Sequence, residues 1–258
     1  MTNVHPTAIV SPQAELGDGV EVWPYAVVGP GVVLGAGTRV GSHASLEGPA
    51  VFGEENRILA HAVLGFEPQD LRYQGEATRL VVGARNVFRE FSTVHRGTVT
   101  GRGETVVGDE NYFMAYSHVA HDCRIGSRTV FANYAALAGH VDVGDHAILG
   151  AFAAAHQFIR IGEYAFVGAY SQLRQDVLPF CKTDGSDART YGLNTIGLKR
   201  NGFSEERLDA LQRAYRLLVK SKLNTSQALE RIAEELGGQP DVKALVTFIR
   251  ESKRGFHR

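Results

Sequence analysis

The sequence is poor in cysteine, in long apolar runs and in net charge, and each shortage excludes a class of protein. The two cysteines, Cys123 and Cys181, form no Cys-x-x-Cys pair, so we expect neither a disulfide framework nor a thiolate zinc site. No apolar run approaches the ~20 residues that cross a bilayer, which predicts no integral membrane span. The first residues lack the basic and apolar regions of a secretory signal, so the expected location is cytoplasmic.

The formal net charge is only −1, which argues against a protein that binds nucleic acid. The charge is unevenly distributed, because residues 199–258 carry 13 Lys and Arg against 8 Asp and Glu. Residues 1–198 carry the compensating excess of acidic side chains. The C-terminal part therefore suits an acidic partner, although solvated faces of surface helices would explain the same pattern.

Glycine, by contrast, is abundant at 29 residues and accompanies a strict internal repeat. Large apolar residues recur every six positions along residues 4–64, and the period resumes at 82–94 and, one residue out of phase, at 107–173. A mostly small residue follows each of them by four positions, as at Ala26 and Ala44. A unit of six residues is too short to bury its apolar side chain alone, so successive units must stack.

Three hexapeptides form an 18-residue coil, and stacked coils predict a parallel β-helix. The large residue would fill the interior, the small residue would occupy the corner, and Gly or Asn would supply the positive φ of each turn. We expect this domain over residues 1–185, with loops at 65–81 and 99–106 where the period breaks. Loops on a rigid scaffold often carry binding residues, so both are candidate walls of a site.

Residues 186–258 are expected to form a connecting segment and a small helical domain, so the fold class is all-β with an α-helical C-terminus. Ser204 can cap a first helix, and Thr225 or Ser226 can begin a second that ends at Gly237-Gly238. A third helix is expected from Pro240, with Val242, Leu245, Val246 and Ile249 on one stripe. Residues 180–203 have no clear period and are predicted to be irregular.

The histidines are the candidate functional residues, and an 18-residue coil converts their spacing into geometry. It places His121, Gly139 and Gln157 above one another on one corner. A neutral imidazole at His121 could act as a general base, with Asp122 fixing its tautomer and the Gly139 N–H stabilising an oxyanion. Alternatively, three histidines could bind zinc, or the column could be a surface polar ladder. Six of the ten histidines fall within 62 residues: His95, His118, His121, His140, His146 and His156.

Several segments together resemble the UDP-N-acetylglucosamine acyltransferases, a family of hexapeptide-repeat enzymes that catalyse the first step of lipid A biosynthesis. The resemblance covers nearly the whole chain, and it implies a left-handed β-helix. The matching segments are Gln69-Asp70-Leu71-Arg72-Tyr73, His95-Arg96-Gly97-Thr98, His118-Val119-Ala120-His121-Asp122-Cys123, Leu137-Ala138-Gly139-His140-Val141, His156-Gln157-Phe158 and Gly197-Leu198-Lys199-Arg200.

The resemblance implies a general-base mechanism without a cofactor or a metal. His121 would deprotonate the glucosamine 3-hydroxyl, Asp122 would orient His121, and Gly139 would bind the oxyanion. The acyl donor would be a 3-hydroxyacyl thioester of acyl carrier protein, and the active form would be a homotrimer. Asn194 and Arg200 would reach the nucleotide, Arg200 at its diphosphate. The other implied substrate contacts are Gln69, Asp70, Arg72, His95, His118, His140, His156 and Gln157.

This chain departs from the usual family pattern at four positions. Arg72 stands where Lys is common, and Asn201 stands where a second Arg often follows the first. In the acyl groove, small Ala169 predicts a moderately long acyl chain, and Asp187 replaces a residue that is often His.

Three alternatives remain at the level of the sequence. A 3-amino sugar acceptor would give an amide in place of an ester. A metal-dependent hydratase of the carbonic anhydrase kind, or a scaffold without activity, would use the same prism.

Overall fold

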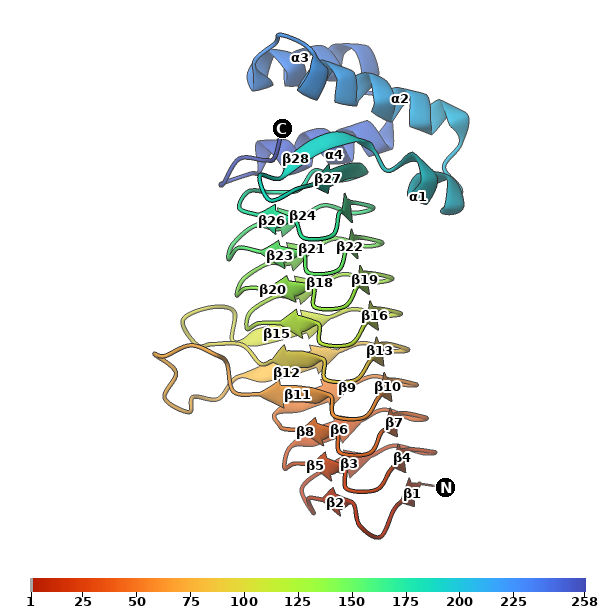
Figure 1. The fold of residues 1–258 in the computed structure, drawn as a ribbon, viewed down its shortest axis with the longest axis vertical. Coiled ribbons are helices and arrows are strands. Elements are labelled where there is room, and N and C mark those ends of the chain that lie inside the picture. The colour runs from red at the N-terminus through yellow and green to blue at the C-terminus, as the bar shows by residue number, and fades with distance from the viewer. Residues whose placement is uncertain (1) are drawn as a thin grey trace.

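The six-residue period folds into three parallel sheets that form the sides of a prism, with helices stacked on one end (Figure 1). The computed structural model describes residues 2–258. The prism is a left-handed parallel β-helix, as predicted. From β1 to β26, consecutive strands lie on consecutive sides, so each strand pairs with strands one coil away.

We call the three sides sheets A, B and C. Sheet A contains β1 (Asn3–Val4), β4 (Glu21–Val22), β7 (Arg39–Val40), β10 (Arg57–Ile58), β13 (Val87–Phe88), β16 (Tyr112–Phe113), β19 (Val130–Phe131), β22 (Ile148–Leu149), β25 (Phe166–Val167), β27 (Cys181–Asp184) and β28 (Arg189–Leu193). Sheet B contains β2 (Ile9–Val10), β5 (Val27–Val28), β8 (Ser45–Leu46), β11 (Val63–Phe66), β14 (Thr93–His95), β17 (His118–Val119), β20 (Ala136–Leu137), β23 (Ala154–Ala155) and β26 (Gln172–Leu173). Sheet C contains β3 (Glu15–Leu16), β6 (Val32–Leu34), β9 (Ala50–Phe52), β12 (Arg79–Val82), β15 (Glu104–Val107), β18 (Arg124–Ile125), β21 (Asp142–Val143) and β24 (Arg160–Ile161).

Two loops interrupt the stacking between sheets B and C. Paired residues are ordinarily 18 apart, as for Asn3 and Glu21, but Val63 pairs with Thr93, and Thr93 pairs with His118. The first loop spans residues 67–78, because β11 and β12 extend into the predicted 65–81. The second spans 96–103, because β15 begins at Glu104, inside the predicted 99–106. Both loops project from the same side of the prism (Figure 1).

The large repeat residues fill the interior of the prism, as predicted. Phe88, Phe113 and Phe131 are fully buried and stack with ring centroids 4.8 Å apart. Burial of each such side chain contributes ~1.5–3 kcal/mol. Stacking therefore supplies the stability that a single hexapeptide lacks.

The expected role of glycine at the corners holds only at Gly19, Gly31 and Gly37, and among the described residues no asparagine has a positive φ. The positive-φ position is the third residue after the large one, and 18 residues other than glycine occupy it, among them Tyr134, His140 and Asp122. Glycine often follows the large residue directly, where a Cβ would overlap the next coil, as at Gly35 against Gly53. Close approach of coils, more often than positive φ, explains the abundance of glycine.

Asparagine forms a buried ladder at the corner between sheets C and A. The Asn86 Nδ2 donates to Asn56 Oδ1 at 3.1 Å, and the Asn111 Nδ2 donates to Asn86 Oδ1 at 2.9 Å. The Thr129 hydroxyl completes the ladder by donating to Asn111 Oδ1 at 2.7 Å. These amides satisfy one another inside the prism, so they are interior residues and not turn formers.

The C-terminal part is helical, but residues 180–203 are more regular than predicted. They contain β27, β28 and the helix α1 (Thr195–Arg200), and β28 pairs with β27 antiparallel. Buried and exposed residues alternate along β27 with a period of two. This strand does not follow the six-residue period, so that period could not predict it. The remaining elements are α2 (Glu205–Tyr215), the π-helical turn η1 (Arg216–Lys220), α3 (Thr225–Leu236) and α4 (Pro240–Arg250).

The predicted helix boundaries are confirmed by their caps. Ser204 accepts from the Arg207 N–H, Asn224 caps α3 with a capping box, and Pro240 opens α4. Arg160 joins the helices to the prism, since its Nη2 donates to Asp176 at 3.0 Å and its guanidinium lies over the Phe248 ring. Within residues 2–258, no helix is both long and apolar enough to cross a membrane.

Candidate active site

The corner between sheets B and C, which we call the site corner, carries most of the candidate residues. It follows β17, β20 and β23 in successive coils. The His140 N–H donates to the His121 carbonyl at 3.0 Å, and the Phe158 N–H donates to the Gly139 carbonyl at 3.3 Å. The corner residues of three coils therefore stack directly. Both projecting loops lie at this corner too, because each connects a strand of sheet B to the next strand of sheet C.

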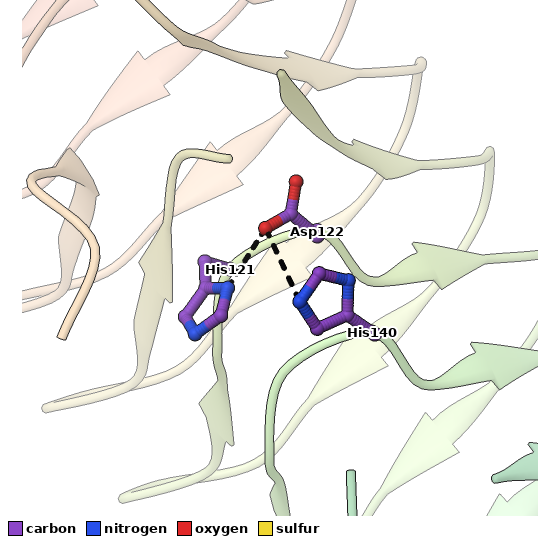
Figure 2. Close-up of side chains that lie close together, drawn as sticks. All are labelled: His121, Asp122 and His140. Atoms are coloured by element: carbon purple, nitrogen blue, oxygen red, sulfur yellow. Dashed lines mark hydrogen bonds and ion pairs between the residues drawn. The ribbon is translucent and has the colours of Figure 1, made fainter. Parts of the chain in front are cut away.

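His121 and Asp122 form the centre of the site (Figure 2). The His121 Nδ1 lies 2.8 Å from Asp122 Oδ2, and the Asp122 side chain is completely buried. Burial opposes the charged form of Asp122, but hydrogen bonds from His121, Thr98 and Arg102 outweigh it and hold the pKa well below its usual range. Because the ionised carboxylate only accepts, the His121 Nδ1 is the donor and its Nε2 keeps the lone pair.

Gly139 lies against the His121 ring from the next coil. A Cβ at this position would fall 2.5–3.0 Å from three atoms of the ring. Among the described residues, no acceptor is hydrogen-bonded to the Gly139 N–H. A glycine here therefore leaves room for the imidazole and an unpaired donor next to it, which suits stabilisation of an oxyanion.

His140 is the second histidine beside Asp122. Its Nε2 lies 3.8 Å from Asp122 Oδ2, and its ring meets the His121 ring edge-on at 5.2 Å (Figure 2). The opposite face of His140 stacks on Phe158 at 4.4 Å. Burial lowers the pKa of His140, which favours the neutral ring at neutral pH.

His95 and His118 form a second pair on sheet B. The His95 Nδ1 donates to the Glu67 carbonyl at 2.5 Å, and the His118 Nδ1 lies 2.7 Å from the Thr93 hydroxyl. Burial lowers the pKa of both, that of His118 to about 4. Both rings are therefore neutral near pH 7, which suits hydrogen bonds to an uncharged ligand.

Asp70 and Arg72 form an ion pair within the 67–78 loop, near His121. Arg72 donates from Nε and Nη2 to the two oxygens of Asp70 at 3.1 and 2.8 Å. These hydrogen bonds hold the pKa of Asp70 down at about 2. Asp70, His95, His118 and His140 lie near enough to His121 for a proton on its ring to influence them, so the groups share one electrostatic site.

Two other kinds of chemistry, metal binding and nucleophilic attack by a thiol, can be tested against the residues of the site. In the part of the chain that the structure describes, His121, Asp122 and His140 form the one cluster with metal-ligating atoms close enough together, within 4.8 Å. Asp122 would have to release hydrogen bonds from Thr98 and Arg102 in order to bind an ion. The adjacent Cys123 is buried, which raises the pKa of its thiol to about 12 and argues against a nucleophilic role.

Other candidate residues lie apart from this centre within one chain. Asn194 caps α1 and donates from its Nδ2 to the Tyr164 carbonyl at 3.0 Å, at the corner between sheets C and A. Arg200 ends the same helix, which lies beside the end of the prism and away from the two projecting loops (Figure 1). Ala169 is exposed in the last coil, at the corner between sheets A and B. Asp187 is exposed in the β27–β28 turn, while Gln69, His156 and Gln157 are exposed on the side of the site.

Sequence reasoning missed the residues that surround Asp122. Thr98 and Arg102 both bind its carboxylate, and Gly101 lies directly against it. Thr93 similarly contacts His118. Two signals pointed to the first group: the family segment His95-Arg96-Gly97-Thr98 and the break in period at residues 99–106. Neither indicated that the loop contacts Asp122.

Comparison with protein-family models identifies both parts of the chain. Residues 13–48 and 104–139 match the model of the bacterial transferase hexapeptide, and residues 176–257 match the second domain of UDP-N-acetylglucosamine O-acyltransferase. Together these matches include two stretches of the repeat, the site residues His121, Asp122 and Gly139, and the helical end.

Full-length relatives agree with the family models. A protein from Halorhodospira halophila is 51% identical, and one from Thermodesulfovibrio yellowstonii is 45% identical, each over 258 residues and 100% of both chains. Both are named as O-acyltransferases of acyl-acyl-carrier-protein and UDP-N-acetylglucosamine. The crystal structure of the Francisella novicida UDP-N-acetylglucosamine acyltransferase superposes with a TM-score of 0.96 at 36% identity, covering 99% of this chain and 94% of that one.

Proposed function

The chain belongs to the family of UDP-N-acetylglucosamine O-acyltransferases, and from this premise we propose that His121 is the general base of its reaction. The protein is an acyltransferase of lipid A biosynthesis. It transfers a 3-hydroxyacyl chain from acyl carrier protein to the glucosamine 3-position of UDP-N-acetylglucosamine. The relatives support this function over the metal-dependent hydratase that the histidines also suggested.

The geometry around His121 supports a direct transfer without a covalent enzyme intermediate. The unprotonated Nε2 takes the proton of the sugar 3-hydroxyl as its oxygen bonds to the thioester carbonyl carbon. The carbonyl oxygen becomes an oxyanion beside the Gly139 N–H. When the oxyanion collapses back to a carbonyl, the new bond to the sugar oxygen is kept and the C–S bond of the thioester breaks. His121 then gives the proton to the departing thiolate. The observation that carries this mechanism is the 2.8 Å bond between His121 and fully buried Asp122.

The surrounding residues supply substrate contacts. Asp70, Arg72, His95, His118 and His140 converge on the same site, and His156 and Gln157 extend it along the next coil. Asn194 and Arg200 would bind the nucleotide from a neighbouring copy, since in their own chain α1 is capped at the corner between sheets C and A and not at the site corner. Small Ala169 supports a moderately long acyl chain, with Asp187 in the same groove.

A homotrimer fits the exposed surface of the prism. Eight rings stack along the corner between sheets A and B at spacings of 4.6–5.1 Å: Tyr25, His43, His61, Phe91, Tyr116, Tyr134, Phe152 and Tyr170. Sheet B lies between this aromatic corner and the site corner. A neighbouring copy that covers the rings would also border the site, and closed three-fold symmetry would repeat the cleft three times.

Two free, buried cysteines suit a reducing compartment, which supports a cytoplasmic location.

The deciding experiment is an acyl-transfer assay with UDP-N-acetylglucosamine and its 3-amino analogue. Each would be paired with 3-hydroxyacyl carrier proteins of several chain lengths, and products would be read by mass spectrometry. We expect transfer to the 3-hydroxyl sugar with a narrow chain-length preference. Failure to acylate either sugar would overturn the function.

His121→Ala should lower kcat by ~10²- to 10⁴-fold, because the base is lost. Sedimentation of the variant should still report a trimer. His5→Ala, which changes an exposed histidine in the first coil, is the matched control and should keep normal turnover. Near-normal turnover of His121→Ala would contradict the mechanism.

A further inference from the structure

Residues 97–103, which we call the carboxylate loop, replace a simple corner with a longer excursion. The Thr98 carbonyl accepts from the N–H groups of Gly101 and Gly103 at 3.1 and 2.9 Å, so the segment closes into a tight turn. The turn directs the Arg102 N–H inward. It does not open into solvent but folds over Asp122, one coil further along the prism.

The carboxylate loop supplies most of the hydrogen bonds that Asp122 receives. The Thr98 N–H lies 3.1 Å from both carboxylate oxygens, and the Thr98 hydroxyl donates to Oδ2 at 2.7 Å. The Arg102 N–H donates to Oδ1 at 2.6 Å. His121 is the only donor to this carboxylate from outside the loop among residues 2–258. A fully buried carboxylate requires this degree of compensation to remain charged.

Glycine and arginine fix the distance between the loop and Asp122. A Cβ on Gly101 would overlap the carboxylate carbon and both oxygens of Asp122, so only glycine allows the backbone to lie there. The Arg102 guanidinium donates to the Asp122 carbonyl at 3.0 Å and to the Asp142 oxygens at 2.5 and 2.9 Å. The loop is therefore attached to two successive coils.

We propose that the carboxylate loop is the positioning element of the catalytic base, with the Thr98 hydroxyl as its decisive side-chain donor. This inference rests on the proposed function. Thr98 and His121 share the same oxygen of Asp122, so the hydroxyl holds Oδ2 in the direction of the His121 Nδ1. His140 faces that oxygen from 3.8 Å and is the competing partner. Thr98 thereby keeps the proton of neutral His121 on Nδ1 and the lone pair on Nε2.

The kinetic test compares three variants with the wild-type trimer. Thr98→Val removes the hydroxyl but keeps the branched shape and the backbone N–H, and we expect kcat to fall ~10- to 100-fold with little change in KM for UDP-N-acetylglucosamine. Thr98→Ser restores the donor and should recover most of kcat. Thr129→Val removes a buried hydroxyl whose 2.7 Å bond serves the asparagine ladder, and it should leave kcat near normal.

A second readout does not depend on activity. Nitrogen-15 spectra of histidine-labelled protein, with His121 assigned by the His121→Gln variant, should show the Nδ1–H tautomer in wild type and Thr98→Ser. Thr98→Val should show a mixture of tautomers. Unchanged kcat and tautomer in Thr98→Val, or equal losses in Thr98→Val and Thr98→Ser, would overturn the inference. An inactive wild type with the expected tautomer shift would overturn the proposed function and leave the positioning role supported.

Discussion

The burial and charge of the site residues are set by the groups that surround them and not by their position in the repeat. Asp122 and Phe158 occupy equivalent positive-φ corners two coils apart, yet one is a buried anion and the other an exposed ring. The difference arises from what covers each corner. The carboxylate loop covers Asp122, while Phe158 stacks on His140 and lies beside the Arg254 guanidinium.

The burial of His118 predicts a loss of stability in acid. Its folded-state pKa of about 4 lies below the ordinary value of 6.5, so the unfolded chain binds more protons between these values. Stability is thus lost as pH falls through this window, and at pH ~4.5 this residue alone accounts for about 2 kcal/mol. Urea unfolding at pH ~7.5 and ~4.5 should show a smaller loss for His118→Gln than for wild type. Equal losses in the two proteins would contradict this assignment.

Individual elements of the prism are two to five residues long and depend on their neighbours in adjacent coils. The asparagine ladder shows how polar groups enter such an interior. Each amide bonds to the amide or backbone of a neighbouring coil, so the ladder crosses the coils lengthened by both loops with its own side-chain amides paired. Hydrophobic stacking and amide pairing therefore act along the same axis.

Removing one member of the ladder should cost more than removing a surface asparagine. Asn86→Ala leaves the Asn111 N–H and Nδ2 groups without their acceptor, and we expect unfolding free energy to fall by about 3 kcal/mol. Asn133→Ala, at an exposed corner, should change it by less than ~0.5 kcal/mol. Chemical denaturation of both variants measures the difference. Similar midpoints would show that the ladder is dispensable.

At the scale of the whole molecule, the helical end brings positive charge beside the site corner. A hollow lined by Arg174, Lys253 and Arg254 surrounds Phe158, whose ring stacks on His140. An acidic acyl carrier protein docked there would place its thioester close to the histidines. Lys253 and Arg254 belong to the basic C-terminal part of the sequence, so such docking would use part of its excess positive charge.

Charge reversal at this hollow should separate carrier binding from chemistry. Arg254→Glu should raise KM for the acyl carrier protein thioester by ~10-fold, while KM for a small acyl-pantetheine thioester stays constant. Arg216→Glu makes the same change on exposed η1, away from the hollow, and serves as the control. Steady-state kinetics with both thioesters decide the matter. A parallel rise for the two donors would show that Arg254 acts on the site itself.

The hexapeptide period alone predicted the prism, its coil length and its loops, because a six-residue unit can bury its apolar side chain only by stacking. Helix caps such as Ser204 and Pro240 likewise revealed the helical end, because capping is a local interaction. The 18-residue coil length also predicted that His121 and Gly139 are neighbours, because residues one coil apart lie above one another. Family resemblance, and not periodicity, indicated the reaction.

Contacts between segments that share no period were decided only in three dimensions. The carboxylate loop reaches Asp122 across 20 or more residues, and no local pattern records which carboxylate it covers. The resemblance implies nucleotide contacts for Asn194 and Arg200, but in their own chain both lie away from the site corner, because the Tyr164 carbonyl holds the cap of α1 at the corner between sheets C and A. Hydrogen bonds between distant segments depend on direction and distance, which one-dimensional spacing does not contain.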